Sequence, residues 1–125
     1  PSRLATVAQI APVLRGLTAI PLQPGERRFA RFILDHRGGP DVTSFVDGAE
    51  IGRYGQAGTV TPDHVIRIKP KPLVLEAPEA GRLEEFGAAA RAALARYQAD
   101  YRAYFARHNA RHAKYRERTG ASLPS

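Results

Sequence analysis

The C-terminal third of the chain carries an apolar stripe that constrains the fold more than any other feature. Apolar residues recur there at steps of three or four, and alanines with high helix propensity fill the positions between them. The stripe consists of Leu83, Phe86, Ala90, Leu94, Tyr97, Tyr101, Tyr104 and Phe105. It predicts a long amphipathic helix that begins near Pro78-Glu79, with glutamates toward its start and arginines toward its end. About 30 residues would give it a length of about 45 Å.

Two shorter helices are expected before it. Residues 3–16 place their apolar side chains on one face, with Ser2 as a suitable N-cap, Gly16 as a stop, and Pro12 expected to kink or shorten the helix. Residues 42–46 predict a short helix, because Pro40 suits a first helical turn and the apolar residues of this segment fall on one side. Their β-branched content leaves a strand as the alternative.

Strands are expected at residues 29–36 and 72–75, whose consecutive apolar residues are typical of strands covered on both faces. A third strand at 65–69 is left open, and the glycine-rich residues 48–61 predict a loop. Together these elements predict an α/β fold, with a small, parallel sheet of two to four short strands, flanking helices and one long C-terminal amphipathic helix.

The length of 125 residues suits one compact domain, which we place at residues 1–118, with a disordered tail at 119–125. No apolar run approaches the ~20 residues of a membrane span. The absence of cysteine excludes disulfides and is consistent with a cytoplasmic location. Because the sequence also lacks methionine, we expect it to be an interior piece of a longer polypeptide.

The net charge of +7 is concentrated at one end of the chain. Residues 102–118 contain six cations and one glutamate, which gives a net charge of +5. This pattern does not favour nucleic-acid binding, because the interleaved aromatic residues fall on the packing face of the helix. His108 and His112 have the i, i+4 spacing of metal ligands, but Asn109 replaces the glutamate of the zinc-protease motif and no third ligand is near. No metal site is predicted.

The strongest set of candidate binding residues is Asp63, His64, Arg67 and Lys69. An Asp–His pair can transfer protons, and the cations that follow, with Lys71, can hold a phosphate or carboxylate. The simpler interpretation is that Asp63 caps a turn and His64 bonds to a backbone carbonyl. Two weaker candidates are the Asp35-His36 pair at a strand end and the glycine loop 52–58, whose backbone amides could cradle a phosphate.

These residues lie within four segments that resemble a known family. The segments are PVLRG (Pro12–Gly16), FILDHRGGPDVTSFVDG (Phe32–Gly48), GTVTPDHVIRIKPKPLVL (Gly58–Leu75) and YQADYRAYFARHNAR (Tyr97–Arg111). The chain resembles the bifunctional rhamnulose-1-phosphate aldolase/short-chain alcohol dehydrogenases of bacterial rhamnose catabolism, over nearly its whole length. The resemblance implies a zinc-dependent class II aldolase module on the N-terminal side and an NAD-dependent dehydrogenase module on the C-terminal side.

The chain corresponds to the stretch between those modules. It has no H-x-H zinc motif, no G-x-x-x-G-x-G fingerprint and no Tyr-x-x-x-Lys pair, so no catalytic residue and no cofactor are assigned to it. We expect a connecting domain that positions the flanking modules, forms homo-oligomer contacts through its tyrosine-rich helix, and completes a site through Asp63, His64 and Arg67. The alternatives are a small-anion (sugar-phosphate) binding module and, less favoured, a nucleic-acid binding domain.

Overall fold

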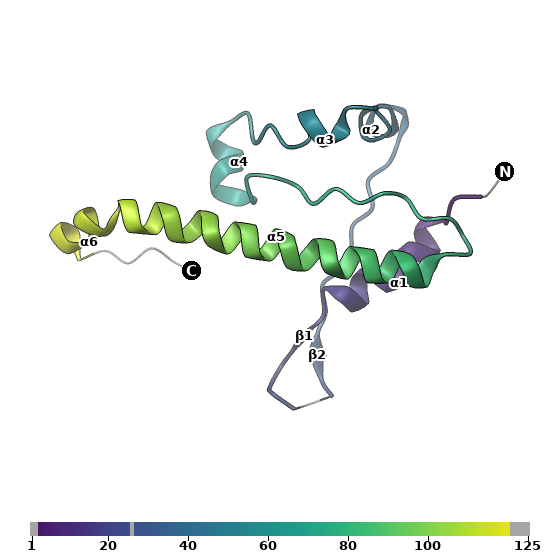
Figure 1. Cartoon of the computed structure of the whole chain (residues 1–125), viewed down its shortest axis with the longest axis horizontal. Helices are drawn as coiled ribbons and strands as arrows, with labels where there is room; N and C mark the ends of the chain where they lie inside the picture. Colours follow the sequence, from purple (N-terminus) through teal and green to yellow (C-terminus); the bar gives the residue numbers. More distant parts are fainter. Residues whose placement is uncertain (1–2, 26, 121–125) are drawn as a thin grey trace. The chain divides into compact units, whose positions relative to one another are not determined.

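The computed structural model describes residues 3–25 and 27–120, which are mostly helical (Figure 1). The chain divides into two compact units, Pro1–Arg91 and Ala92–Ser125. In the described residues, no helix combines the length and the apolar character needed to cross a membrane. The expectation of a single domain over residues 1–118 stays a prediction.

Helix α1 (Val7–Leu17) begins four residues later than the sequence pattern predicts. Thr6 is its N-cap, and the Thr6 backbone N–H donates to Gln9 Oε1 at 2.9 Å. The preceding residues are engaged elsewhere, because the Ala5 N–H donates to the Pro78 carbonyl at 2.8 Å and the Ala80 N–H to the Arg3 carbonyl at 2.9 Å. The proposed N-cap Ser2 lies outside the described residues.

Pro12 lies inside α1 without ending it, and the helix also continues through Gly16, which is therefore not the predicted stop. The helix ends at Leu17, and its C-cap is Thr18, whose Oγ1 donates to the Leu14 carbonyl at 3.0 Å. The Thr18 N–H donates to the same carbonyl at 3.1 Å. The two bonds satisfy the Leu14 carbonyl, which lies in the last turn of the helix and has no partner within it.

The described residues contain one hairpin, formed by β1 (Ile20–Pro21) and β2 (Phe29–Ala30). The two strands are antiparallel, with Ile20 opposite Ala30 and Pro21 opposite Phe29. The prediction of a parallel sheet is therefore wrong for this part of the chain. Parallel neighbours need a crossover of about a dozen residues or more, whereas residues 22–28 join β1 directly to β2.

Most of the predicted strand residues are extended but unpaired. Residues 31–38 and 72–78 have no strand partner within the described chain, so the predicted strands at 29–36 and 72–75 reduce to Phe29–Ala30. Ile33 is 95% exposed, although the pattern predicts a buried position. An apolar run becomes a strand only where a neighbouring strand accepts its hydrogen bonds, and the described chain supplies none.

The third strand that the sequence left open at 65–69 is absent, because helix α4 (Pro62–Arg67) occupies most of this segment. Thr61 is its N-cap in an extended conformation, Pro62 occupies the first turn and Asp63 adds a negative charge there. A proline whose fixed φ suits a helix start outweighs the β-branched residues that follow it.

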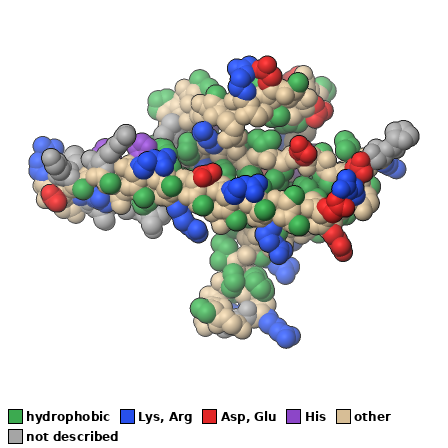
Figure 2. Space-filling view, viewed as in Figure 1, with side chains coloured by type: hydrophobic (Ala, Val, Ile, Leu, Met, Phe, Trp, Pro, Cys, Tyr) green, Lys and Arg blue, Asp and Glu red, His purple; other side chains and the backbone are tan. Residues whose placement is uncertain are grey.

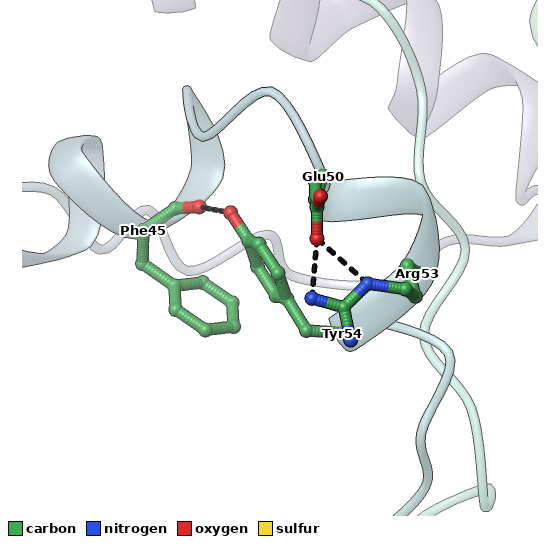
Figure 3. A network of polar contacts seen from close by, with 4 residues as sticks. All are labelled: Phe45, Glu50, Arg53 and Tyr54. Carbon is green, nitrogen blue, oxygen red and sulfur yellow. Dashed lines mark hydrogen bonds and ion pairs between the residues drawn. The ribbon is translucent and has the colours of Figure 1, made fainter.

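Helix α2 (Pro40–Val46) confirms the predicted short helix, with Pro40 at its first turn, and the strand alternative is wrong. Helix α3 (Ile51–Tyr54) lies inside the predicted loop 48–61. Figure 3 shows how α2 and α3 are joined: the Tyr54 hydroxyl donates to the Phe45 carbonyl at 2.5 Å. The Phe45 and Tyr54 rings lie 4.8 Å apart between centroids, so the two short helices form one small cluster.

An ion pair between Arg53 and Glu50 lies beside this cluster (Figure 3). The Arg53 Nε donates to Glu50 Oε2 at 2.7 Å, and both side chains are more than half exposed. An exposed pair of this kind contributes little to stability, so the aromatic contact and the tyrosine hydrogen bond hold α2 to α3.

Gly39, the N-cap of α2, has φ +138° and ψ 166°, a conformation that side chains rarely adopt. We expect Gly39→Ala to lower the free energy of unfolding by about 1–3 kcal/mol. Gly52→Ala is the matched control, because Gly52 has no positive φ and an added Cβ would meet nothing within 4 Å. Urea denaturation followed by circular dichroism measures both changes. Equal effects of the two substitutions would contradict the backbone strain at Gly39.

Helix α5 (Leu83–Arg111) confirms the long C-terminal helix. It begins at Leu83 and not at Pro78-Glu79, because residues 78–80 are bonded to residues 3–5. In the first unit, a Cβ added at Gly87 would lie 3.4 Å from Val13 Cγ1, so the start of α5 packs against α1. Ala90, at 2% exposure, and Pro78 are the buried residues of the described chain.

Helix α6 (Ala113–Thr119) follows α5 in the second unit. The Arg116 guanidinium reaches back to the end of α5, where its Nη2 donates to the Asn109 carbonyl at 2.9 Å and its Nη1 to the Asn109 side chain. Thr119 ends α6 and Gly120 caps it with φ +65°. The rest of the predicted tail, residues 121–125, lies outside the described residues.

Arg82 forms an ion pair with Glu85 at the start of α5. The hydrogen bond from Arg82 lowers the pKa of Glu85 below its ordinary value of 4.5. Any stability from the pair is therefore present above this value and is lost as the pH falls through the lowered pKa. Because both groups are exposed, we expect Glu85→Gln to leave the acid-unfolding curve unchanged. A clear shift of that curve, measured by circular dichroism, would contradict this expectation.

Candidate functional site

The predicted binding residues gather on and just after helix α4. Asp63 and His64 lie in its first turn, Arg67 is its last residue, and Lys69 follows two residues later. Asp63 and Arg67 stand at i, i+4 and therefore share one helix face. Neither makes an ion pair within the described residues, so the carboxylate and the guanidinium are both available to a ligand or a partner.

The His64 side chain is held by the residue that precedes the helix. Thr61 Oγ1 lies 2.5 Å from His64 Nδ1, so the ring bonds to a side-chain hydroxyl and not to a backbone carbonyl as the simpler interpretation predicted. The Thr61 side chain makes no cap bond to the backbone. His64 is exposed, and its Nε2 makes no hydrogen bond within the described chain. This arrangement fixes one ring nitrogen and leaves the other for proton transfer or hydrogen bonding.

Two large hydrophobic residues of the same segment are strongly exposed. Val60 is 97% exposed and Ile66 is 79% exposed. Ile66 lies at i+3 from Asp63, which places both on the face of α4 that carries Arg67. We define the α4 surface as Val60, Asp63, His64, Ile66 and Arg67. It combines apolar anchors with a carboxylate, an imidazole and a guanidinium on one short segment.

Sequence analysis did not find Val60 and Ile66, because the strand considered at 65–69 would have buried part of this segment. Thr61-Pro62-Asp63 could have indicated this surface, because an N-cap residue followed by proline and an acidic residue predicts the start of a helix. In a helix, residues three or four positions apart share a face, whereas in a strand alternate residues do.

The glycine loop 52–58 does not provide the predicted phosphate cradle. Five consecutive backbone N–H groups, those of Arg53, Tyr54, Gly55, Gln56 and Ala57, already donate to backbone carbonyls of this segment. A phosphate cradle needs such groups unpaired and converging on one point. The Gln56 side chain also ties the loop to the Pro72 carbonyl at 3.0 Å. The loop is thus a structural turn around α3.

The Asp35-His36 pair does not act as a unit. The Asp35 carboxylate accepts from Arg37 Nε at 3.0 Å, and both side chains are exposed. The strand end at which we expected this pair is absent from the described residues. The Asp35 carboxylate therefore bonds to Arg37, and no hydrogen bond joins it to His36 within the described residues.

The histidines of the second unit do not form a metal site with their neighbours. His108 packs its ring against Tyr104, with centroids 4.3 Å apart, and Tyr104 in turn stacks on Tyr101 at 6.2 Å. His112 lies between α5 and α6 as the N-cap of α6. In the described part of the chain, no three histidine, cysteine or acidic side chains converge, so these residues do not fit the zinc ion that the resemblance implies for the whole enzyme.

Comparison with known families gives one finding. The family described as class II aldolase, second domain, matches residues 5–122. Neither the curated proteins nor the solved structures provide a match. The family match covers nearly all of the first unit, including the α4 surface, and nearly all of the second. On this coverage, the chain belongs to the class II aldolase second-domain family.

Proposed function

We propose that this chain is the connecting domain of a cytoplasmic bifunctional enzyme of rhamnose catabolism, between a class II aldolase module and an NAD-dependent short-chain dehydrogenase module. Membership of the class II aldolase second-domain family supports the aldolase part of this proposal. The dehydrogenase part rests on the resemblance of segments such as Gly58–Leu75. Zinc and NAD would be held by the flanking modules, and the whole enzyme would assemble into a homo-oligomer through the tyrosine-rich helix α5.

The observation that carries the proposal is the apolar surface of the first unit. Figure 2 shows many hydrophobic side chains at the surface, including those of the β1–β2 hairpin at the bottom of the view. All but one of the exposed large hydrophobic residues of the described chain belong to the first unit, the exception being Tyr104. Exposed apolar surface of this extent supports the proposal of a contact with another polypeptide.

The α4 surface is the part best suited to complete a site on the aldolase module. Val60 and Ile66 would be buried against that module and would bring the polar residues to its edge. Arg67, with Lys69 after it, would then bind the phosphate of a sugar phosphate. His64 would hold or move a proton at its free Nε2, with Asp63 beside it.

A free-standing small-anion module is the alternative that uses the same cations. The glycine loop 52–58 does not support it, because the amides there are already bonded within the segment. The connecting role accounts for both the polar and the apolar residues of the α4 surface, whereas anion binding alone does not explain the exposure of Val60 and Ile66.

Isothermal titration calorimetry tests the proposal. The 125-residue chain is titrated with the separately produced aldolase module of the same enzyme, and in parallel with a sugar phosphate. We expect binding to the aldolase module, and no binding of the sugar phosphate alone that depends on Arg67. Binding of the sugar phosphate that is lost in Arg67→Ala, without any affinity for the module, would contradict the connecting role. DNA binding that weakens with salt would contradict it as well.

A further inference from the structure

An open groove of about 630 Å³ lies in the first unit, away from the α4 surface. One wall is helix α1, and the other is the extended segment that follows β2. The lining residues are Ala8, Ala11, Pro12, Arg15, Gly16, Arg31, Ile33 and Leu34. This volume lies within the range of about 300–1,000 Å³ that small-molecule sites occupy.

The β1–β2 hairpin brings the two walls together. Strand β1 follows α1 after two residues, and β2 leads directly into Arg31. Ile20 pairs with Ala30, and the Leu22 N–H donates to the Arg28 carbonyl at 3.1 Å. Because of this pairing, residues 31–34 lie beside the end of α1. The groove follows from this pairing and does not depend on other parts of the chain.

The groove presents two cations and an apolar surface. Neither Arg15 nor Arg31 forms an ion pair or a side-chain hydrogen bond within the described residues. The carbonyls at the end of α1 are already bonded, since the Leu14 carbonyl accepts from Thr18 and the Gly16 carbonyl accepts from the Ala19 N–H at 3.3 Å. The guanidinium groups are thus free for an external acceptor.

Apolar surface borders these guanidinium groups. Ile33 is 95% exposed and Leu34 is 42% exposed, and both line the groove. Ala8, Ala11 and Pro12 give the α1 wall an apolar character as well. A ligand that contacts the arginines would therefore also cover hydrocarbon, which a bare inorganic ion cannot do.

We propose that this groove binds an organic anion in which a phosphate or carboxylate group is attached to an apolar body. The planar guanidinium of arginine matches both head groups through paired hydrogen bonds. The apolar body would lie on Ile33, Leu34 and the alanine face of α1. This groove shares no residue with the α4 surface, so the proposal of anion binding can be tested independently of the connecting role.

The test is calorimetry on the full 125-residue chain with phenyl phosphate, benzoate and inorganic phosphate. We expect phenyl phosphate or benzoate to bind more tightly than inorganic phosphate, and the tighter of the two identifies the preferred head group. Arg15→Gln and Arg31→Gln should each weaken that binding about tenfold or more, because a hydrogen bond to a charged group is lost. Ile33→Ser should weaken it while leaving inorganic phosphate unaffected.

Arg91→Gln and Arg96→Gln are the matched controls, because each removes one exposed arginine outside the groove. Both should bind the probes like the unmodified chain, and circular dichroism checks that every variant folds. An absence of binding by both aromatic probes would overturn the proposal. Equal losses in the groove variants and the control variants would also overturn it, since this result indicates non-specific attraction to a basic protein.

Discussion

Replacing Ala90 by glutamate is expected to lower the free energy of unfolding by about 3 kcal/mol or more. Ala90 is 2% exposed and lies on α5, in the part of the helix that belongs to the first unit. A glutamate there would place a charge and four additional heavy atoms where the neighbouring residues leave almost no access to water. Typical domains are stable by about 5–15 kcal/mol, so this loss would remove a large fraction of the free energy of unfolding.

Ala89→Glu is the matched control, because Ala89 is the exposed neighbour on the same helix and glutamate has good helix propensity. Urea denaturation of both variants, followed by the helical signal in circular dichroism, gives the two free energies. We expect Ala89→Glu to stay within about 0.5 kcal/mol of the unmodified chain. Similar free energies of unfolding for the two variants would show that Ala90 is not packed inside the first unit.

Replacing Val60 and Ile66 together by aspartate is expected to weaken association with the aldolase module at least about 100-fold, or about 3 kcal/mol. In the free chain these side chains are 97% and 79% exposed, so the substitutions remove almost no contacts there. In the complex they would be buried, and two aspartates would bring unpaired charges into the interface. The unfolding curve of the isolated chain should therefore be unchanged.

Leu22→Asp provides the control for this experiment, because Leu22 is an exposed hydrophobic residue on the β1–β2 hairpin and lies outside the α4 surface. It should reduce association with the aldolase module far less than the double substitution does. Calorimetry or surface plasmon resonance provides the dissociation constants. Unchanged affinity of the Val60 and Ile66 double variant would exclude the α4 surface as the contact with the module.

The helices were the most predictable part of this fold. Pro40 marked the start of α2 correctly, and the apolar stripe identified the long helix. The start of that helix was placed several residues too early, because residues 78–80 bond to residues 3–5. A local pattern contains no information about a partner more than 70 residues away in the sequence.

The sheet could not be predicted for a related reason. The apolar run after Phe29 has the composition of a buried strand, but a strand also requires a neighbour that accepts its hydrogen bonds. Within the described chain, that neighbour exists only for Phe29–Ala30. Composition therefore indicated the extended backbone of residues 31–34 and could not indicate whether another strand would cover it.

In the candidate sites, too, the residue types could be predicted from the sequence, whereas their contacts could not. The residue types at Asp63, His64 and Arg67 were found from their chemistry, and the structure places them on one helix. The contact of His64 with Thr61 depended on recognising that helix. The groove at Arg15 and Arg31 was not foreseen, because its two walls meet only through the pairing of β1 with β2.

Hydrogen–deuterium exchange tests the central claim most directly, namely that the α4 surface is a contact with the aldolase module. The 125-residue chain is measured alone and then saturated with that module. We predict that the backbone amides of residues 60–68 exchange markedly more slowly in the complex. Unchanged exchange at residues 60–68, with slowing confined to other segments or absent throughout, would contradict the account.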